Sequence, residues 1–173
     1  MVGFLTSKEK EENLRRLMEN YGHEIKRICY VYLKEEQLAQ DATQDTFWKA
    51  YQSYEEFEGR AEEKTWLIRI AINTCKNYLR TAWLRRVLPG HPLPQEGEET
   101  LGKRLEQQQV TAQVLALPTK YREVVLLYYY QGYQTKEIAQ LLHLPQSTIS
   151  TRLRRAKEQL RAQLKGWWED EEL

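Results

Sequence analysis

The second half of this 173-residue chain takes its fold from residues 134–165, QTKEIAQLLHLPQSTISTRLRRAKEQLRAQLK. The apolar residues of this stretch first recur at helical spacing, at Ile138, Ala139, Leu141 and Leu142. The pattern breaks at Pro145, because proline lacks an amide hydrogen and disfavours helix in the residue before it. A second apolar stripe then runs through Ile149, Leu153, Ala156, Leu160 and Leu164. The stretch therefore predicts a helix-turn-helix.

The second helix of this pair is basic on the side opposite its apolar stripe. That side carries hydroxyls first and arginines later, at Ser147, Thr148, Thr151, Arg154 and Arg155. Residues 146–165 hold six basic residues and one acidic residue, although the net charge of the whole chain is only +1. Such a helix suits the DNA major groove, with arginines on the phosphates. A solvated surface hairpin is the alternative, but the local charge excess favours DNA.

The composition is that of a globular protein with one or two small domains. Hydrophobic residues make up 41% of the chain and charged residues 29%, which is too apolar for global disorder. The longest apolar run, residues 124–130, is too short to span a bilayer, and residues 1–10 lack the pattern of a signal peptide. We therefore expect a cytoplasmic protein with no direct membrane insertion.

The sequence offers no recognisable catalytic chemistry. Cys29 and Cys75 lie in separate helical patterns without a neighbouring Cys or His cluster, so buried thiols are expected rather than a disulfide or a zinc site. The three histidines are scattered, and neither a glycine-rich phosphate loop nor a serine elbow is present. We expect no enzyme activity, no catalytic residues, no metal and no cofactor.

Helical periodicity continues through most of the chain, which predicts an all-α protein of two small modules. The first module is expected over residues 1–86, and the second, with the helix-turn-helix, over residues 105–173. Between them, residues 87–104 contain three of the five prolines of the chain and an acidic cluster. This composition indicates an extended linker.

The first module contains a predicted helix with an acidic and aromatic face, over residues 36–54. The residues of that face are Asp41, Gln44, Asp45, Trp48 and Gln52. A solvated face would explain the carboxylates, whereas a displayed tryptophan is more typical of a protein interface. Both interpretations remain open on spacing alone.

An acid-free helix is predicted directly after this acidic region. Residues 64–86 contain six basic residues and no acidic residue. Arg69, Asn73, Lys76 and Arg80 form a row on the outward face, flanked by Trp66 and Asn77. Cations, amides and an aromatic ring together suit single-stranded DNA, whose bases stack on aromatic side chains. The alternative is that Trp66 belongs to the core and the cations are solvated.

Three motifs in this order resemble a bacterial RNA polymerase sigma factor of the extracytoplasmic-function (ECF) group. They are DATQDTFWKAY at 41–51, KTWLIRIAINTCKNYLR at 64–80, and the segment 117–161 that begins LPTKYREVV. The resemblance implies a protein that binds core RNA polymerase and promoter DNA, initiates transcription at specific promoters, and is held inactive by an anti-sigma factor. The expected polymerase contacts are Asp41, Gln44, Asp45 and Trp48.

The resemblance also assigns the two DNA elements of a promoter. The residues expected to contact the melted minus-ten element are Trp66, Arg69, Asn73, Lys76, Asn77 and Arg80. The minus-thirty-five duplex falls to Gln146, Ser147, Thr148, Ser150, Thr151, Arg152, Arg154 and Arg155. Ser147 and Ser150 replace a glycine and a lysine frequent in the family, so the bases read here do not carry over. The sequence LAQD at 38–41 replaces the usual DAED and leaves fewer carboxylates at the polymerase-facing helix.

Two rival classes use the same features differently. A dimeric repressor would bind a palindrome through the helix-turn-helix without polymerase, but it leaves the acid-free helix at 64–86 unexplained. A protein-interaction adaptor would use the face around Trp48 and the pair Trp167 and Trp168 near the C-terminus. The acidic residues 169–172 either form a disordered tail or fold back on the basic helix.

Overall fold

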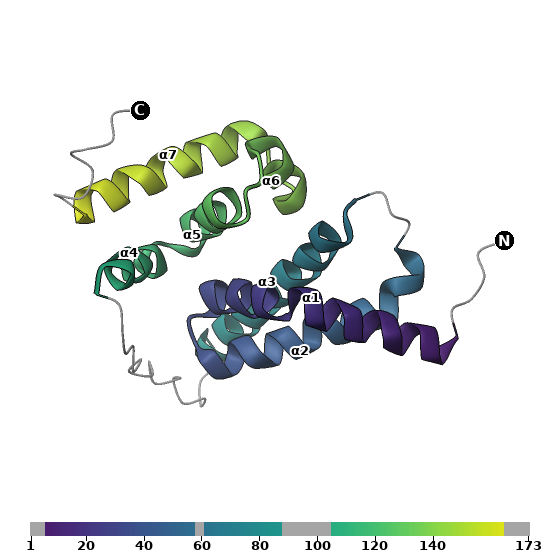
Figure 1. Cartoon of the computed structure of the whole chain (residues 1–173). Coiled ribbons are helices and arrows are strands. Elements are labelled where there is room, and N and C mark those ends of the chain that lie inside the picture. Colours follow the sequence, from purple (N-terminus) through teal and green to yellow (C-terminus); the bar gives the residue numbers. More distant parts are fainter. Residues whose placement is uncertain (1–5, 58–60, 88–104, 165–173) are drawn as a thin grey trace. The chain divides into compact units, whose positions relative to one another are not determined.

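The computed structural model describes residues 6–57, 61–87 and 105–164, and every element in these ranges is a helix (Figure 1). The all-α prediction is therefore confirmed. The chain divides into two compact units, Met1–Gly97 and Glu98–Leu173. Apart from Val87, the expected linker lies outside the described residues, as does the C-terminal segment with Trp167, Trp168 and the acidic tail. No helix in the described ranges is long and apolar enough to cross a membrane.

Three helices make up the first unit: α1 (Ser7–Leu33), α2 (Glu36–Ser53) and α3 (Glu63–Val87), with a short 3-10 turn, η1 (Tyr54–Glu56), after α2. A capping box starts α1: the Glu9 amide donates to the Thr6 hydroxyl at 3.3 Å, and the Thr6 amide donates to the Glu9 carboxylate at 2.7 Å. The helix ends at Lys34, whose left-handed backbone (φ 61°) turns the chain into α2.

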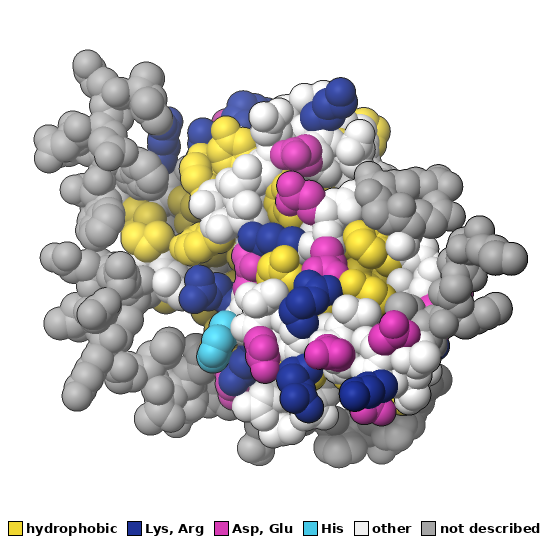
Figure 2. All heavy atoms as spheres, turned by 45° about the vertical axis from the view of Figure 1, so that its right-hand side comes forward, with side chains coloured by type: hydrophobic (Ala, Val, Ile, Leu, Met, Phe, Trp, Pro, Cys, Tyr) yellow, Lys and Arg dark blue, Asp and Glu magenta, His cyan; other side chains and the backbone are white. Residues whose placement is uncertain are grey.

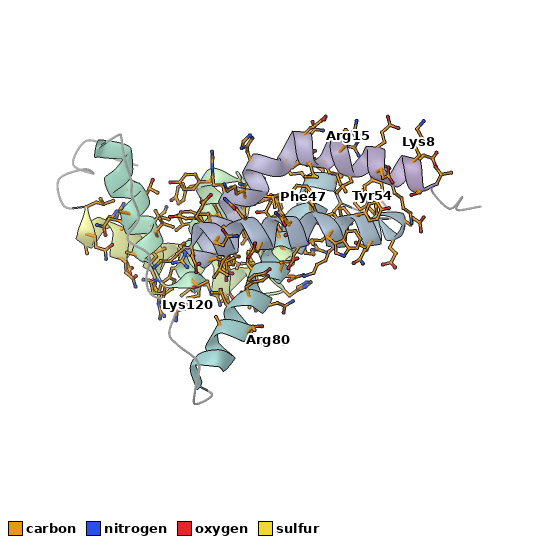
Figure 3. All side chains as sticks on the ribbon, turned by 90° about the horizontal axis from the view of Figure 1, so that it is seen from below. Lys8, Arg15, Phe47, Tyr54, Arg80 and Lys120 are labelled. Atoms are coloured by element: carbon orange, nitrogen blue, oxygen red, sulfur yellow. The ribbon has the colours of Figure 1, made fainter. Side chains whose placement is uncertain are left out.

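Each of these helices packs on the other two (Figure 1). The fully buried aliphatic side chains come mainly from α1 and α3, including Leu17, Ile25, Ile28, Leu67, Ile68 and Ile72. On α2 the buried residues are mostly alanines, which let its backbone approach both neighbours, with Phe47 between α1 and α2 (Figure 3). Cys29 and Cys75 are fully buried, as expected, and the neighbouring Cys29 thiol, together with burial, raises the pKa of Cys75.

The second unit contains α4 (Leu105–Ala116), α5 (Thr119–Val125), a π-helical turn η2 (Leu126–Tyr130), α6 (Thr135–Leu142) and α7 (Gln146–Gln163). Between α6 and α7, His143 adopts a left-handed conformation (φ 54°) and Pro145 caps α7. The amide of Leu144 closes this turn by donating to the Ala139 carbonyl at 3.0 Å. The helix-turn-helix prediction is thus confirmed in its position and in its turn.

The apolar stripe predicted on α7 is the centre of the second core. All five of its residues are buried, and α7 packs against α4, α5 and α6. The buried Arg122 of α5 ties down the end of α4, because its Nη1 donates to the carbonyls of Leu115 at 2.8 Å and Leu117 at 2.9 Å. These are carbonyls that a helix end leaves without a helical partner. The polar face of α7 is left turned away from this core.

Candidate polymerase and nucleic-acid interfaces

The predicted polymerase-facing surface of α2 is displayed to solvent. Asp45, Gln44 and Gln52 are exposed, and Asp41 is half-buried. Trp48 is 57% exposed and stacks on Tyr51, with ring centroids 5.6 Å apart and an interplanar angle of 18°. An exposed tryptophan stacked on a half-buried tyrosine beside carboxylates has the chemistry of a protein-binding hot spot. Tyr51 was not part of the sequence prediction, although its spacing from Trp48 is helical.

One carboxylate of this surface is anchored to the neighbouring helix. The hydroxyl of Tyr78, on α3, donates to Oδ2 of Asp45 at 2.7 Å. Desolvation, together with this hydrogen bond, raises the pKa of Tyr78 to about 12. The phenol therefore stays protonated and holds the carboxylate in one orientation, which reduces the entropy lost when a partner binds.

The predicted minus-ten face of α3 is polar and accessible. Asn73, Lys76, Asn77 and Arg80 are exposed, whereas Arg69 is half-buried. In Figure 3, Arg80 lies on the C-terminal part of α3, which projects past α1 and α2. Cationic and amide groups therefore share one helix face, as the sequence pattern predicted.

Trp66 lies differently from a simple displayed ring. It is half-buried, and it packs against Phe57, with centroids 4.9 Å apart, and edge-on against Tyr54 at 5.9 Å. Trp66 is therefore partly packed and partly accessible, and both sequence interpretations remain open. Its use for base stacking stays a prediction.

The beginning of α3 is fixed by a polar network that the sequence did not indicate. Nη1 and Nη2 of Arg16, on α1, donate to the two carboxylate oxygens of Glu63 at 2.7 and 2.6 Å. The Tyr54 hydroxyl donates to the same carboxylate at 2.7 Å and accepts from Arg16 at 3.0 Å. Arg16 lowers the pKa of Glu63, because its hydrogen bonds favour the charged carboxylate. These contacts join α1, η1 and α3 next to Trp66.

On α7, most of the predicted minus-thirty-five residues face solvent. Gln146, Ser147, Ser150, Thr151, Arg154 and Arg155 are exposed, and Thr148 and Arg152 are half-buried. Gln146 donates to the Thr135 hydroxyl at 2.9 Å, which links the first turn of α7 to α6. Arg154 pairs with Glu158 one turn later at 2.6 Å, an exposed pair that contributes little to stability.

Arg152 forms an ion pair inside the protein. Its Nη1 donates at 2.7 Å to Oε1 of Glu123, a residue of α5 that is only 5% exposed. A buried carboxylate needs such a partner, because an unpaired charge in the interior is strongly unfavourable. The assignment of Arg152 to DNA therefore stays a prediction, and a structural role stands beside it.

No group of three or more His, Cys, Asp or Glu side chains in the described part of the chain is arranged to hold a metal ion. The polar surfaces on α2, α3 and α7 consist of amides, hydroxyls, carboxylates, guanidinium groups and aromatic rings. Groups of this kind bind macromolecules by hydrogen bonding, ion pairing and stacking.

Two sequence families account for both units. Residues 17–85 match Sigma-70 region 2, and residues 107–160 match Sigma-70, region 4. The ECF RNA polymerase sigma factor SigW of Bacillus subtilis is 30% identical over 86% of this chain and 87% of its own length. An ECF RNA polymerase sigma-E factor of Haemophilus influenzae is also 30% identical, over 83% of each chain. The chain belongs to the ECF group of RNA polymerase sigma factors, which act in transcription initiation.

Solved structures share the fold. The sigma factor RpoE of Bartonella quintana, in complex with the anti-sigma factor NepR, has a TM-score of 0.70 and 21% identity, over 90% of this chain and 98% of RpoE. CnrH, in complex with the cytosolic domain of CnrY, has a TM-score of 0.64 and 24% identity, over 88% and 87% of the two chains.

Proposed function

We propose that this sigma factor binds core RNA polymerase through the exposed face of α2, reads the minus-thirty-five duplex with α7, and captures melted minus-ten DNA with α3. The observation that carries this proposal is the division of chemistry between two helices. The α7 face combines hydroxyls and arginines, whereas the α3 face combines amides and cations without an acidic residue between 64 and 86. Duplex edges suit the first face, and single-stranded bases suit the second.

The affinity for promoter DNA is expected to come largely from polymerase. Lys and Arg side chains are intermixed with Asp and Glu on the face shown in Figure 2, and the net charge of the chain is only +1, so general attraction to DNA is weak. One good bidentate base contact contributes only about 1–3 kcal/mol. When polymerase holds both modules, the second contact becomes intramolecular, which raises affinity by roughly 10²–10⁴.

Promoter opening then follows as a shift of population rather than as catalysis by this chain. Unstacked minus-ten bases captured by Asn73, Lys76 and their neighbours stabilise the open state over the closed duplex. A base stacked on the half-buried Trp66 would add about 1–3 kcal/mol to that preference. No nucleotide hydrolysis by sigma is required.

The Bartonella sigma factor RpoE forms a complex with an anti-sigma factor. We propose that an anti-sigma factor is likewise the negative regulator of this chain. The exposed Trp48, stacked on Tyr51, supports this, because a regulator that covered Trp48 would block the proposed polymerase contact. Because polymerase transcribes the chromosome, we propose that this protein acts in the cytoplasm.

Transcription in vitro by core polymerase plus this protein, on fragmented genomic DNA, tests the function. Sequencing of transcript 5′ ends should yield a shared pair of upstream elements. A gel shift with and without core polymerase separates the rival classes. Tight binding to a palindrome without polymerase would indicate a repressor, and loss of all promoter-specific transcripts would indicate an adaptor.

A further inference from the structure

A polar hollow of the second unit lies between α5 and α7, and the sequence assigned no role to its α5 residues, Lys120 and Tyr121. The side chains that matter in its wall are Lys120, Tyr121, Ser147, Thr148, Thr151 and Arg155. Lys120, labelled in Figure 3, and Tyr121 come from α5, which is not one of the two helices of the helix-turn-helix. The others come from the polar face of α7. The hollow therefore joins the predicted reading helix to a helix outside the motif.

The hollow is electropositive. Arg152 also borders it, but its charge is offset by the buried Glu123 at 2.7 Å. Lys120 and Arg155 form no ion pair with a carboxylate in the described ranges. The Arg155 guanidinium, followed by Lys120, lowers the pKa of the Tyr121 phenol, which indicates a positive potential at that hydroxyl.

Tyr121 also restrains one of the two cations. Its side chain is largely buried, at 7% exposure, and the ring belongs to the second core. Nζ of Lys120 lies 5.1 Å from the centroid of the Tyr121 ring, and Arg155 lines the same hollow from α7. The rigid ring thus restrains the flexible lysine in the wall that also contains Arg155, which reduces the entropy lost on binding an anion there.

We propose that this hollow binds one backbone phosphate of the minus-thirty-five duplex, with Lys120 and Arg155 as counter-ions and the Ser147 and Thr151 hydroxyls as donors. A phosphodiester accepts hydrogen bonds only, and the hollow offers cations and hydroxyls. DNA is favoured over a free anion because the same α7 residues carry the proposed groove contacts. The inference rests on the proposed function and adds Lys120 and Tyr121 to its site.

A phosphate bound in this hollow has a specific consequence for how α7 recognises bases. Phosphate contacts set register and orientation on a duplex but carry no sequence information. A phosphate held between α5 and α7 would fix how deeply α7 enters the groove. Loss of Lys120 should therefore weaken binding to all minus-thirty-five sequences alike while preserving the preference among them.

The test uses the full chain with core polymerase and promoter duplexes in which single minus-thirty-five phosphates are replaced by neutral methylphosphonates. In the unaltered protein, the replacement that removes the bound phosphate should lower affinity roughly tenfold at low salt. In Lys120→Ala that same replacement should have little further effect, and the salt slope should fall by about 1. Tyr121→Phe keeps the ring but removes the hydroxyl, so it should also reduce the dependence of affinity on that one phosphate. Arg161→Ala, an exposed cation of α7 outside the hollow, serves as the control and should leave it unchanged.

Additive effects of Lys120→Ala and every methylphosphonate would overturn the inference while leaving the proposed function intact. Competition by orthophosphate beyond that of chloride at equal ionic strength, lost in Lys120→Ala, would assign the hollow to a free anion and overturn the DNA assignment. A holoenzyme that does not discriminate among minus-thirty-five sequences would overturn both the proposed function and this inference.

Discussion

Arg16 and Glu63 form a two-point ion pair across 47 positions of the sequence, with N–O distances of 2.7 and 2.6 Å. The pair links the middle of α1 to the first residue of α3, and Tyr54 closes it into a network. Bidentate geometry is the strong form of an arginine–carboxylate contact. The start of the proposed minus-ten helix is therefore held by a residue outside any DNA-binding motif.

Removing this pair should destabilise the first unit. For Arg16→Ala we expect a loss of about 1 kcal/mol in the free energy of unfolding, since the pair is bidentate but Arg16 is partly exposed. Urea denaturation measures the loss, with Lys8→Ala, an exposed cation of α1, as the control. Equal stability of the two variants would contradict a structural role for the pair.

The stabilisation by this pair should depend on pH in a defined direction. Because Arg16 lowers the pKa of Glu63, the folded state favours the carboxylate. The contribution is complete above the ordinary carboxyl pKa of about 4.3 and is lost as the pH falls through the lowered native value. The stability difference between the unaltered protein and Glu63→Gln should therefore shrink below about pH 4. A difference that grows on acidification would show that another group is responsible.

Trp48 should be a hot spot for core polymerase. We expect Trp48→Ala to weaken binding by about 2 kcal/mol, or roughly thirtyfold, without lowering stability, because the ring is exposed. Met18→Ala, which removes another exposed apolar side chain, is the matched control on α1. Biolayer interferometry with core polymerase gives both affinities. Similar small losses for the two variants would remove Trp48 from the interface.

Asn73 and Lys76 should act in promoter opening rather than in docking. For Asn73→Ala and Lys76→Ala we expect normal closed-complex binding and a roughly tenfold loss of open complex, since each captured base contributes only a few kcal/mol. Permanganate reactivity of unpaired thymines reports opening, and a gel shift at low temperature reports docking. Arg154→Ala should show the reverse pattern. Normal melting with reduced docking would refute the assignment of these two α3 residues.

Arg152 should contribute to stability before it contributes to DNA binding. Arg152→Gln leaves the buried Glu123 without this partner, so we expect a loss of about 3 kcal/mol. The double change with Glu123→Gln should recover most of it, because two neutral amides replace the ion pair. Thermal unfolding measures both variants. The stable double variant then reports DNA binding alone, and we expect its minus-thirty-five affinity to stay reduced. Full affinity would limit Arg152 to its structural role.

Local sequence pattern was enough to predict the helices and their buried and exposed faces. The stripe from Ile149 to Leu164 is buried as its spacing predicted, and Pro145 lies at the predicted turn. These features follow from local rules, since helical periodicity and proline geometry act within a few residues of chain. The order and composition of the motifs were likewise enough to predict the family.

Packing between helices sets which of the predicted surface residues have partners inside the protein. The sequence pattern assigned Arg152 and Trp66 to DNA-binding faces. In the folded protein, Arg152 forms an ion pair with Glu123, and Trp66 packs against Phe57. Packing also brings Lys120 beside Arg155 and Cys29 beside Cys75. Helical spacing fixes the direction of a side chain on its own helix. Its partner depends on how helices distant in sequence pack, which local periodicity does not encode.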